Sequence, residues 1–92
     1  MKNYGAKEFI ELCKKEVAKY FNKNKDKTDK DQNLDSDDIF VVWYSKTLQN
    51  HKALLSTPIP DGMYYELTYN GDKNELYFDA YKKWENKCIK LN

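Results

Sequence analysis

The sequence predicts an α+β fold over residues 1–92, treated as a single domain: an amino-terminal helix, a four-stranded antiparallel meander and a short carboxy-terminal helix. Three observations predict this class. Apolar residues recur at helical spacing near the amino terminus, while aromatic and β-branched residues crowd residues 39–84, with turn residues between the runs. A chain of 92 residues can also supply only one modest hydrophobic core.

The helix is expected over residues 6–21, because apolar side chains recur there at spacings of three and four. Asn3 or Gly5 is suited to cap its start. The apolar positions of this stripe are Ala6, Phe9, Ile10, Cys13, Val17, Tyr20 and Phe21.

Residues 22–38 are polar and charged apart from Leu34, and we expect a solvated, charged linker. Its alternating acidic and amide residues resemble the first ligand positions of an EF-hand. However, Leu34 stands where the turn requires glycine, and Phe40 stands where a bidentate glutamate is required. Divalent-ion binding therefore stays open only as an alternative for this segment, which contains Asp29, Asp31, Asn33, Asp35 and Asp37.

The meander begins with a first strand over residues 39–48, which we expect to be central because both of its faces are apolar. Residues 49–51 form the next turn, and residues 53–57 a short second strand. Pro60, Asp61 and Gly62 then supply a turn with a preset φ followed by a flexible glycine.

The last hairpin is predicted by Asn70 and Gly71 between two alternating strands. A two-residue turn would place Glu66 opposite Glu75, so that two carboxylates repel each other. A four-residue turn over residues 71–74 instead pairs Tyr69 with Leu76 and Leu67 with Phe78, and we expect this register.

The carboxy-terminal helix is predicted by apolar residues at helical spacing, namely Tyr81, Trp84, Cys88 and Leu91, with Asp79 as its N-cap. A fourth strand that continues to Trp84 is the alternative.

Alternation divides the meander into two faces. The core face is expected to contain Val41, Trp43, Tyr65, Leu67 and Phe78, and the outer face Tyr64, Glu66, Tyr77 and Asp79. We expect a partner on the outer face, together with Lys82 and Lys83 at the start of the last helix.

Charge is unevenly distributed along the chain, although the net charge is only +1. Residues 1–30 carry nine Lys and five acidic residues, residues 31–79 three Lys and nine acidic residues, and residues 80–92 four Lys and one Glu. The basic ends and acidic centre favour electrostatic docking over a uniform nucleic-acid footprint. Arginine is absent, which argues against sequence-specific DNA reading.

No catalytic or metal-binding pattern stands out, and we expect neither an enzyme nor a cofactor or metal. The single histidine, His51, is expected on a surface turn, and Cys13 and Cys88 as buried, reduced thiols. These three residues lack the close spacing of a zinc site. The hairpin carboxylates Glu66, Asp72, Glu75 and Asp79 are expected to be solvated, because the domain has little room for a cleft.

Nucleic-acid binding is the alternative function. The order helix, strands, helix is that of double-stranded-RNA-binding domains, and Lys82 and Lys83 lie where such domains present basic residues. Tyr64 and Tyr77 could stack single-stranded bases. The acidic sheet and the extra strand argue against this reading.

Two segments carry a family resemblance: KTLQNHKALLST and DGMYYELTYNGDKNELYFDAYKKWEN. They resemble a family of small proteins of unknown function encoded by phages and prophages of Gram-positive bacteria, over roughly residues 39–88. The resemblance implies a phage origin and the cytoplasm of a bacterial host. It implies no active-site residues.

Small phage accessory proteins commonly bind and disable host proteins. The resemblance thus implies a non-catalytic phage accessory protein that binds a host macromolecule, in particular an inhibitor of a host defence protein of the anti-CRISPR or anti-restriction type. No apolar run approaches the roughly 20 residues of a membrane span, and the amino terminus lacks the apolar segment of a signal peptide. We therefore expect no membrane association.

Overall fold

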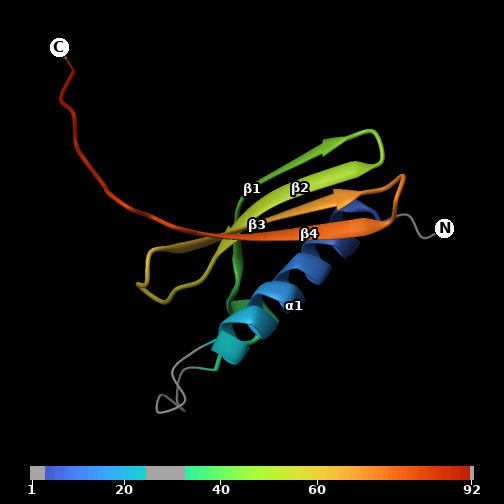
Figure 1. The fold of residues 1–92 in the computed structure, drawn as a ribbon, viewed down its shortest axis with the longest axis horizontal. Helices are drawn as coiled ribbons and strands as arrows, with labels where there is room; N and C mark the ends of the chain where they lie inside the picture. Colours follow the sequence, from blue (N-terminus) through green and yellow to red (C-terminus); the bar gives the residue numbers. More distant parts are fainter. Residues whose placement is uncertain (1–3, 25–32, 92) are drawn as a thin grey trace.

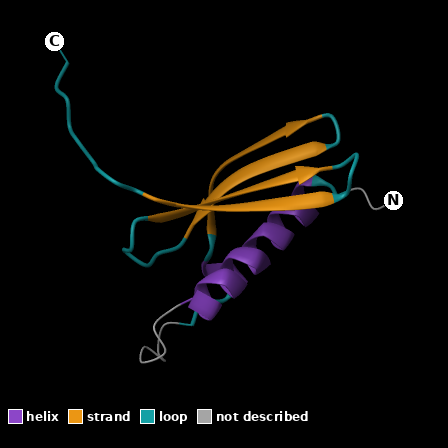
Figure 2. Ribbon diagram, viewed as in Figure 1, coloured by secondary structure: helices purple, strands orange, loops and turns teal. Residues whose placement is uncertain are grey.

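The computed structural model describes residues 4–24 and 33–91. They form a helix and a four-stranded sheet in the order β1-β2-β3-β4 (Figure 1). The elements are α1 (Ala6–Asn24), a 3-10 turn η1 (Ser36–Asp38), β1 (Phe40–Thr47), β2 (Asn50–Ser56), β3 (Met63–Asn70) and β4 (Glu75–Lys82). Every neighbouring pair of strands is antiparallel (Figure 2). The predicted α+β class, amino-terminal helix and four-stranded meander are confirmed.

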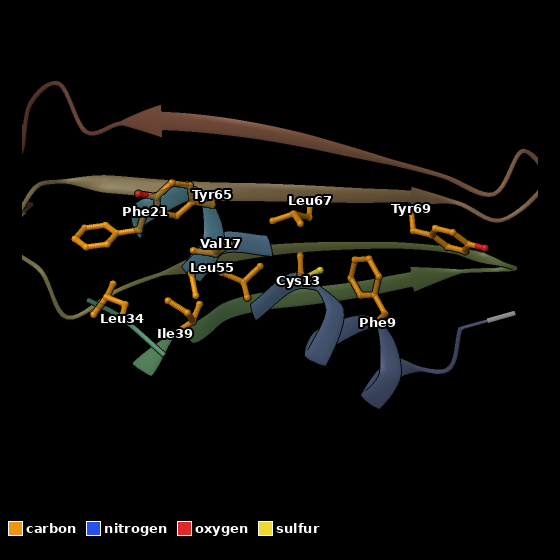
Figure 3. Close-up of a cluster of buried hydrophobic side chains, with 12 residues drawn as sticks. Phe9, Cys13, Val17, Phe21, Leu34, Ile39, Leu55, Tyr65, Leu67 and Tyr69 are labelled. Atoms are coloured by element: carbon orange, nitrogen blue, oxygen red, sulfur yellow. The ribbon is translucent and has the colours of Figure 1, made fainter. Parts of the chain in front are cut away.

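The helix packs on one face of the sheet, mainly against β2. Phe9, Cys13 and Val17 of its apolar stripe are fully buried, as the helical spacing predicts. Figure 3 shows these side chains pointing toward Leu55 and Leu67 of the sheet. This contact forms the hydrophobic core, so the helix-covered face of the sheet is its inner face.

The helix extends into the predicted linker, because α1 continues to Asn24. The Asn22 amide donates a hydrogen bond to the Leu34 carbonyl and accepts one from the Leu34 N–H, both at 2.9 Å. Leu34 is consequently a core residue, 8% exposed, and not part of a solvated linker. Asp29 and Asp31 of the EF-hand-like pattern lie outside the described residues.

The β3–β4 hairpin has the predicted register, with Tyr69 opposite Leu76 and Leu67 opposite Phe78. The four-residue turn is held by the Asn70 side chain, whose Oδ1 accepts hydrogen bonds from the N–H groups of residues 72 and 73. A Cβ at position 71 would collide with the Gln49 carbonyl oxygen of the neighbouring turn, so only glycine fits there.

The expectation of a central first strand is wrong, because β1 is an edge strand. Its register shifts between Val41 and Trp43, so that Val41 lies opposite Leu55 and Trp43 opposite Leu54. This β-bulge inserts one extra residue, Val42, and the side chains after it exchange faces. Trp43, expected in the core, therefore lies on the outer face and is 41% exposed.

The β1–β2 turn is shorter than expected. Thr47 pairs with Asn50, which leaves only Leu48 and Gln49 in the turn, and Leu48 takes the left-handed conformation with φ 56°. The second strand thus begins at Asn50 instead of residue 53. His51 consequently lies in a strand, on the inner face, and not on a surface turn.

The predicted carboxy-terminal helix is not present. Lys82 pairs with Met63, and the Lys83 N–H donates to the Gly62 carbonyl at 2.7 Å, so the start of the expected helix is held in the sheet. The remaining residues are too few to form a stable helix without a surface to pack on. Residues 84–91, named here the tail, have no regular structure and lead away from the sheet (Figure 1).

We predict that deletion of residues 84–92 changes the free energy of unfolding by no more than about 0.5 kcal/mol, since Trp84 is 96% exposed and Leu91 is 90% exposed. In contrast, Leu67→Ala should cost about 2–5 kcal/mol, because Leu67 is fully buried against the helix. Urea denaturation measures both. A large loss on tail deletion would mean that the tail packs on the domain in solution.

Candidate functional site

The outer face of the sheet has no covering helix in the part of the chain that the structure describes. Alternation and register bring ten side chains together there. We name this surface the open face; it contains Trp43, Ser45, Lys52, Leu54, Tyr64, Glu66, Thr68, Tyr77, Asp79 and Tyr81. Tyr77 and Tyr81 are each 50% exposed, so aromatic rings face solvent here. Such clustered aromatic surface is typical of a binding site.

Four of the six predicted site residues lie on the open face. Glu66 is directly opposite Asp79, Tyr64 is opposite Tyr81, and Tyr77 is opposite Thr68. The predicted outer face of β3 and β4 is therefore correct as a placement of side chains.

Lys82 and Lys83 do not join this group. Lys82 is the last residue of β4. Alternation places its side chain on the inner face of the sheet, whereas Asp79 and Tyr81 are on the open face. Lys83 follows the strand and is exposed. No helix presents these two lysines together.

Trp43, Leu54 and Tyr81 belong to the open face but were not predicted there. The bulge that turns Trp43 outward has no signal in the sequence beyond an unusually long apolar run. Tyr81 fits the helical spacing of the predicted carboxy-terminal helix as well as the alternation of a strand. Leu54 lies between two other apolar residues, Ala53 and Leu55, so the sequence does not indicate which face of the strand its side chain occupies.

The charges of the open face are mainly acidic. One ammonium group, that of Lys52, lies 3.6 Å from Glu66. The Tyr77 hydroxyl donates a hydrogen bond of 2.8 Å to Glu75, and this bond, together with the carboxylate charge, raises the pKa of Tyr77. The carboxylates of Asp79 and then Glu66 raise the pKa of Tyr81. Both phenols therefore keep their protons at neutral pH and can donate hydrogen bonds.

The open face is only shallowly hollowed. A depression of about 360 Å³ lies beside the ring of Trp43 and is also lined by Ser45, Lys52 and Thr68. Its mostly apolar wall carries one ammonium group, an arrangement that suits a side chain of a partner protein.

His51 is 2% exposed and lies between two hydrogen-bond partners. Its Nε2 is 2.8 Å from the Tyr4 carbonyl oxygen and its Nδ1 is 2.6 Å from the Tyr44 hydroxyl. A carbonyl can only accept, so Nε2 carries a proton and donates it, and the Tyr44 hydroxyl is placed to donate to Nδ1. The ring also stacks on Phe9, with centroids 4.9 Å apart. Both nitrogens are thus engaged within the fold.

The two cysteines have different surroundings. Cys13 is fully buried, and burial, followed by the charge of Glu16, raises the pKa of its thiol to about 12. Cys88 lies exposed in the tail, so the expectation that it is buried is wrong. Neither cysteine forms a disulfide.

Among residues 4–24 and 33–91, no group of three or more His, Cys, Asp or Glu side chains is placed to hold a metal ion. The same residues contain no helix with the length and apolar character of a membrane span.

Comparison with models of known protein families identifies a match. A family model described as a family of unknown function (DUF6275) matches residues 10–91. The matched region runs from α1 through the sheet to the end of the tail. No curated protein and no solved structure matches the chain.

We predict that Tyr44→Phe lowers the free energy of unfolding by about 1–3 kcal/mol, because it leaves Nδ1 of the buried His51 without a donor. Tyr77→Phe is the matched control: it removes a hydroxyl whose bond to Glu75 is exposed, and should leave stability unchanged. Urea denaturation of the two variants measures the difference. Equal effects would contradict the assigned role of His51.

We also predict that a maleimide at neutral pH labels Cys88 rapidly and Cys13 only after unfolding. Cys13 is buried and its pKa is raised to about 12, so almost no reactive thiolate is present. Mass spectrometry of the native and urea-unfolded chain counts the labels. Rapid double labelling of the native chain would contradict the burial of Cys13.

Proposed function

The chain belongs to this family of unknown function (DUF6275), and we propose that it is a non-catalytic protein that binds a partner protein on its open face. The exposure of Trp43, Tyr77 and Tyr81 on one uncovered sheet surface, with the partly buried Tyr64 beside them, is the observation that carries this proposal. Tyrosine and tryptophan supply large contact areas at low entropic cost, and both are enriched at protein interfaces.

The charge of the open face indicates the kind of partner protein. Its two carboxylates, Glu66 and Asp79, outnumber its one ammonium group, that of Lys52, which already lies beside Glu66. A partner surface with basic residues complements these carboxylates, and their attraction raises the rate at which the two proteins associate. We therefore propose a partner with a basic surface, such as the groove with which a nucleic-acid-binding protein holds its ligand.

We further propose that the protein is a phage accessory protein acting in a bacterial cytoplasm, where it inhibits a host defence protein of the anti-CRISPR or anti-restriction type. This part rests on the family resemblance of residues 39–88 and on the chemistry of the open face. An acidic, aromatic surface can compete with nucleic acid for a basic groove.

The absence of catalysis is part of the proposal. The carboxylates of Glu66 and Asp79 lie opposite each other, but on an exposed sheet surface where water is not excluded. His51 already uses both of its ring nitrogens within the fold. Neither group is therefore arranged for general acid–base chemistry.

Direct nucleic-acid binding remains an outcome of the test. The basic residues that would support it do not form the expected helix, and the lysines of α1 alternate with Glu8, Glu11 and Glu16. Binding through scattered lysines would weaken steeply with salt, in contrast to an interface centred on aromatic side chains.

The test captures a protein from a bacterial lysate with the immobilised chain and then measures the affinity of the purified partner. We predict that Tyr64→Ala weakens binding about 10- to 30-fold, as expected for an aromatic side chain within an interface. The matched control is Leu48→Ala, since Leu48 is apolar and 80% exposed but lies in the β1–β2 turn.

Equal affinity of the two variants would overturn the assignment of the open face. Nucleic-acid probes in a gel-shift series across salt form the second arm. A shift at low salt that vanishes as salt rises, without capture of a protein, would replace the proposal with the nucleic-acid alternative.

A further inference from the structure

One edge of β4 has no partner strand among the described residues. β4 pairs with β3 on one side and is last in the strand order, and no other described element pairs with its free edge. Its ladder with β3 is regular from Glu75 to Lys82, without a bulge, and the strand contains no proline. A regular edge of this length offers a row of N–H and C=O groups to another strand.

The opposite edge of the sheet is protected. The bulge at Val42 breaks the regular spacing of β1 and twists the strand, which discourages pairing with another chain. The helix lies mainly against β2, and its Tyr20 contacts Phe78 of β4 on the inner face of the sheet. Of the two edges, that of β4 is the regular one.

We infer that the free edge of β4 pairs antiparallel with β4 of a second copy of this chain, with the two Phe78 residues opposite each other. The pairing would join the two four-stranded sheets into one continuous sheet. It would also place the two open faces side by side. This inference is independent of the proposed function.

The charges along β4 select this register. Both copies keep their inner faces on the same side only when the paired positions are both odd or both even. Registers centred on Phe78 or Asp79 pair seven residues of each β4 strand, whereas those centred on Tyr77 or Ala80 pair only five; the Ala80 register has no like-charge pair but is shorter than the Phe78 register. Centring on Tyr77 places Glu75 opposite Asp79 of the second copy, and centring on Asp79 places two aspartates opposite each other. Like charges directly opposite are destabilising.

The register centred on Phe78 has no like-charge pair. Tyr77 lies opposite Asp79 of the second copy, and Tyr81 lies opposite its Glu75. The Tyr77 hydroxyl already donates to Glu75 of its own chain, so these pairs place a neutral phenol opposite a carboxylate and add no repulsion. The absence of like-charge pairs, together with the apolar inner side of this register, points to a second copy as the occupant of this edge.

The inner side of the same register is apolar. Phe78 packs against Tyr20 of α1, with ring centroids 5.0 Å apart, and both rings line a depression of about 210 Å³. Pairing would bring Phe78 of the second copy beside this surface and Ala80 of the second copy opposite Leu76. Apolar area that is partly exposed in the single chain would thus become covered.

Analytical ultracentrifugation of the full chain over a concentration series tests the inference. A reducing agent is present, so that the exposed Cys88 cannot cross-link copies. We expect a concentration-dependent species of twice the 11.0 kDa chain mass. A chain that stays monomeric into the millimolar range would overturn the inference.

Two opposite substitutions at one exposed position test the register. Tyr77→Glu places a carboxylate opposite Asp79 of the second copy twice per dimer, and should weaken the dimer at least tenfold. Tyr77→Lys places an ammonium group there and should bind at least as tightly as the unmodified chain. Thr68→Glu is the control, because Thr68 is next to Tyr77 on β3 but away from the edge, and should leave the dimer unchanged.

Equal weakening by both Tyr77 variants would overturn the register. A monomeric chain that still binds its partner protein through Tyr64 would overturn the dimer while leaving the proposed function intact. A dimeric chain that captures no partner protein would overturn the proposed function while leaving the dimer intact.

Discussion

The burial of one sheet face beneath a single helix is the interaction on which the rest of this structure depends. A four-stranded meander alone gains little stability in water, and α1 supplies the apolar surface that it needs. Phe9, Cys13 and Val17 are fully buried against Leu55 and Leu67. His51 belongs to the same layer, where its hydrogen bonds tie β2 to β1 and to the segment that precedes α1.

Within residues 4–24 and 33–91, one long helix covers one face of the sheet and no helix covers the other. The aromatic residues of the other face remain in contact with solvent, and the free edge of β4 remains beside them. The tail leaves the same strand with Trp84 exposed. All these surfaces follow from the small size of the chain, because a core of this size cannot bury every large side chain that the sequence contains.

The features that the sequence predicted correctly are those set by local rules. The spacing of Phe9, Cys13 and Val17 defines a helix, and repulsion between Glu66 and Glu75 selects the hairpin register. The open face could be found on β3 and β4 for the same reason, since simple alternation places Tyr64 and Tyr77 on one side.

The errors concern features that depend on the tertiary structure. One extra residue at Val42 reverses Trp43, and the run of apolar residues around it hides the reversal. His51 stands in a turn-like context, but its partners Tyr4 and Tyr44 become neighbours only after folding. The predicted carboxy-terminal helix has helical spacing but no surface on which to pack, and pairing with β3 holds its first residues, Tyr81 and Lys82, in the ladder instead.

The central claim is that the free chain buries its inner face and displays its open face. Nuclear magnetic resonance with a soluble paramagnetic agent tests this most directly, because the agent broadens the signals of exposed rings. The account predicts strong broadening for Tyr77 and Trp84 and protection of Phe9 and Tyr65. Protection of the Tyr77 and Trp84 rings in the free monomer would contradict it, since the tail would then cover the face that we assign to a partner.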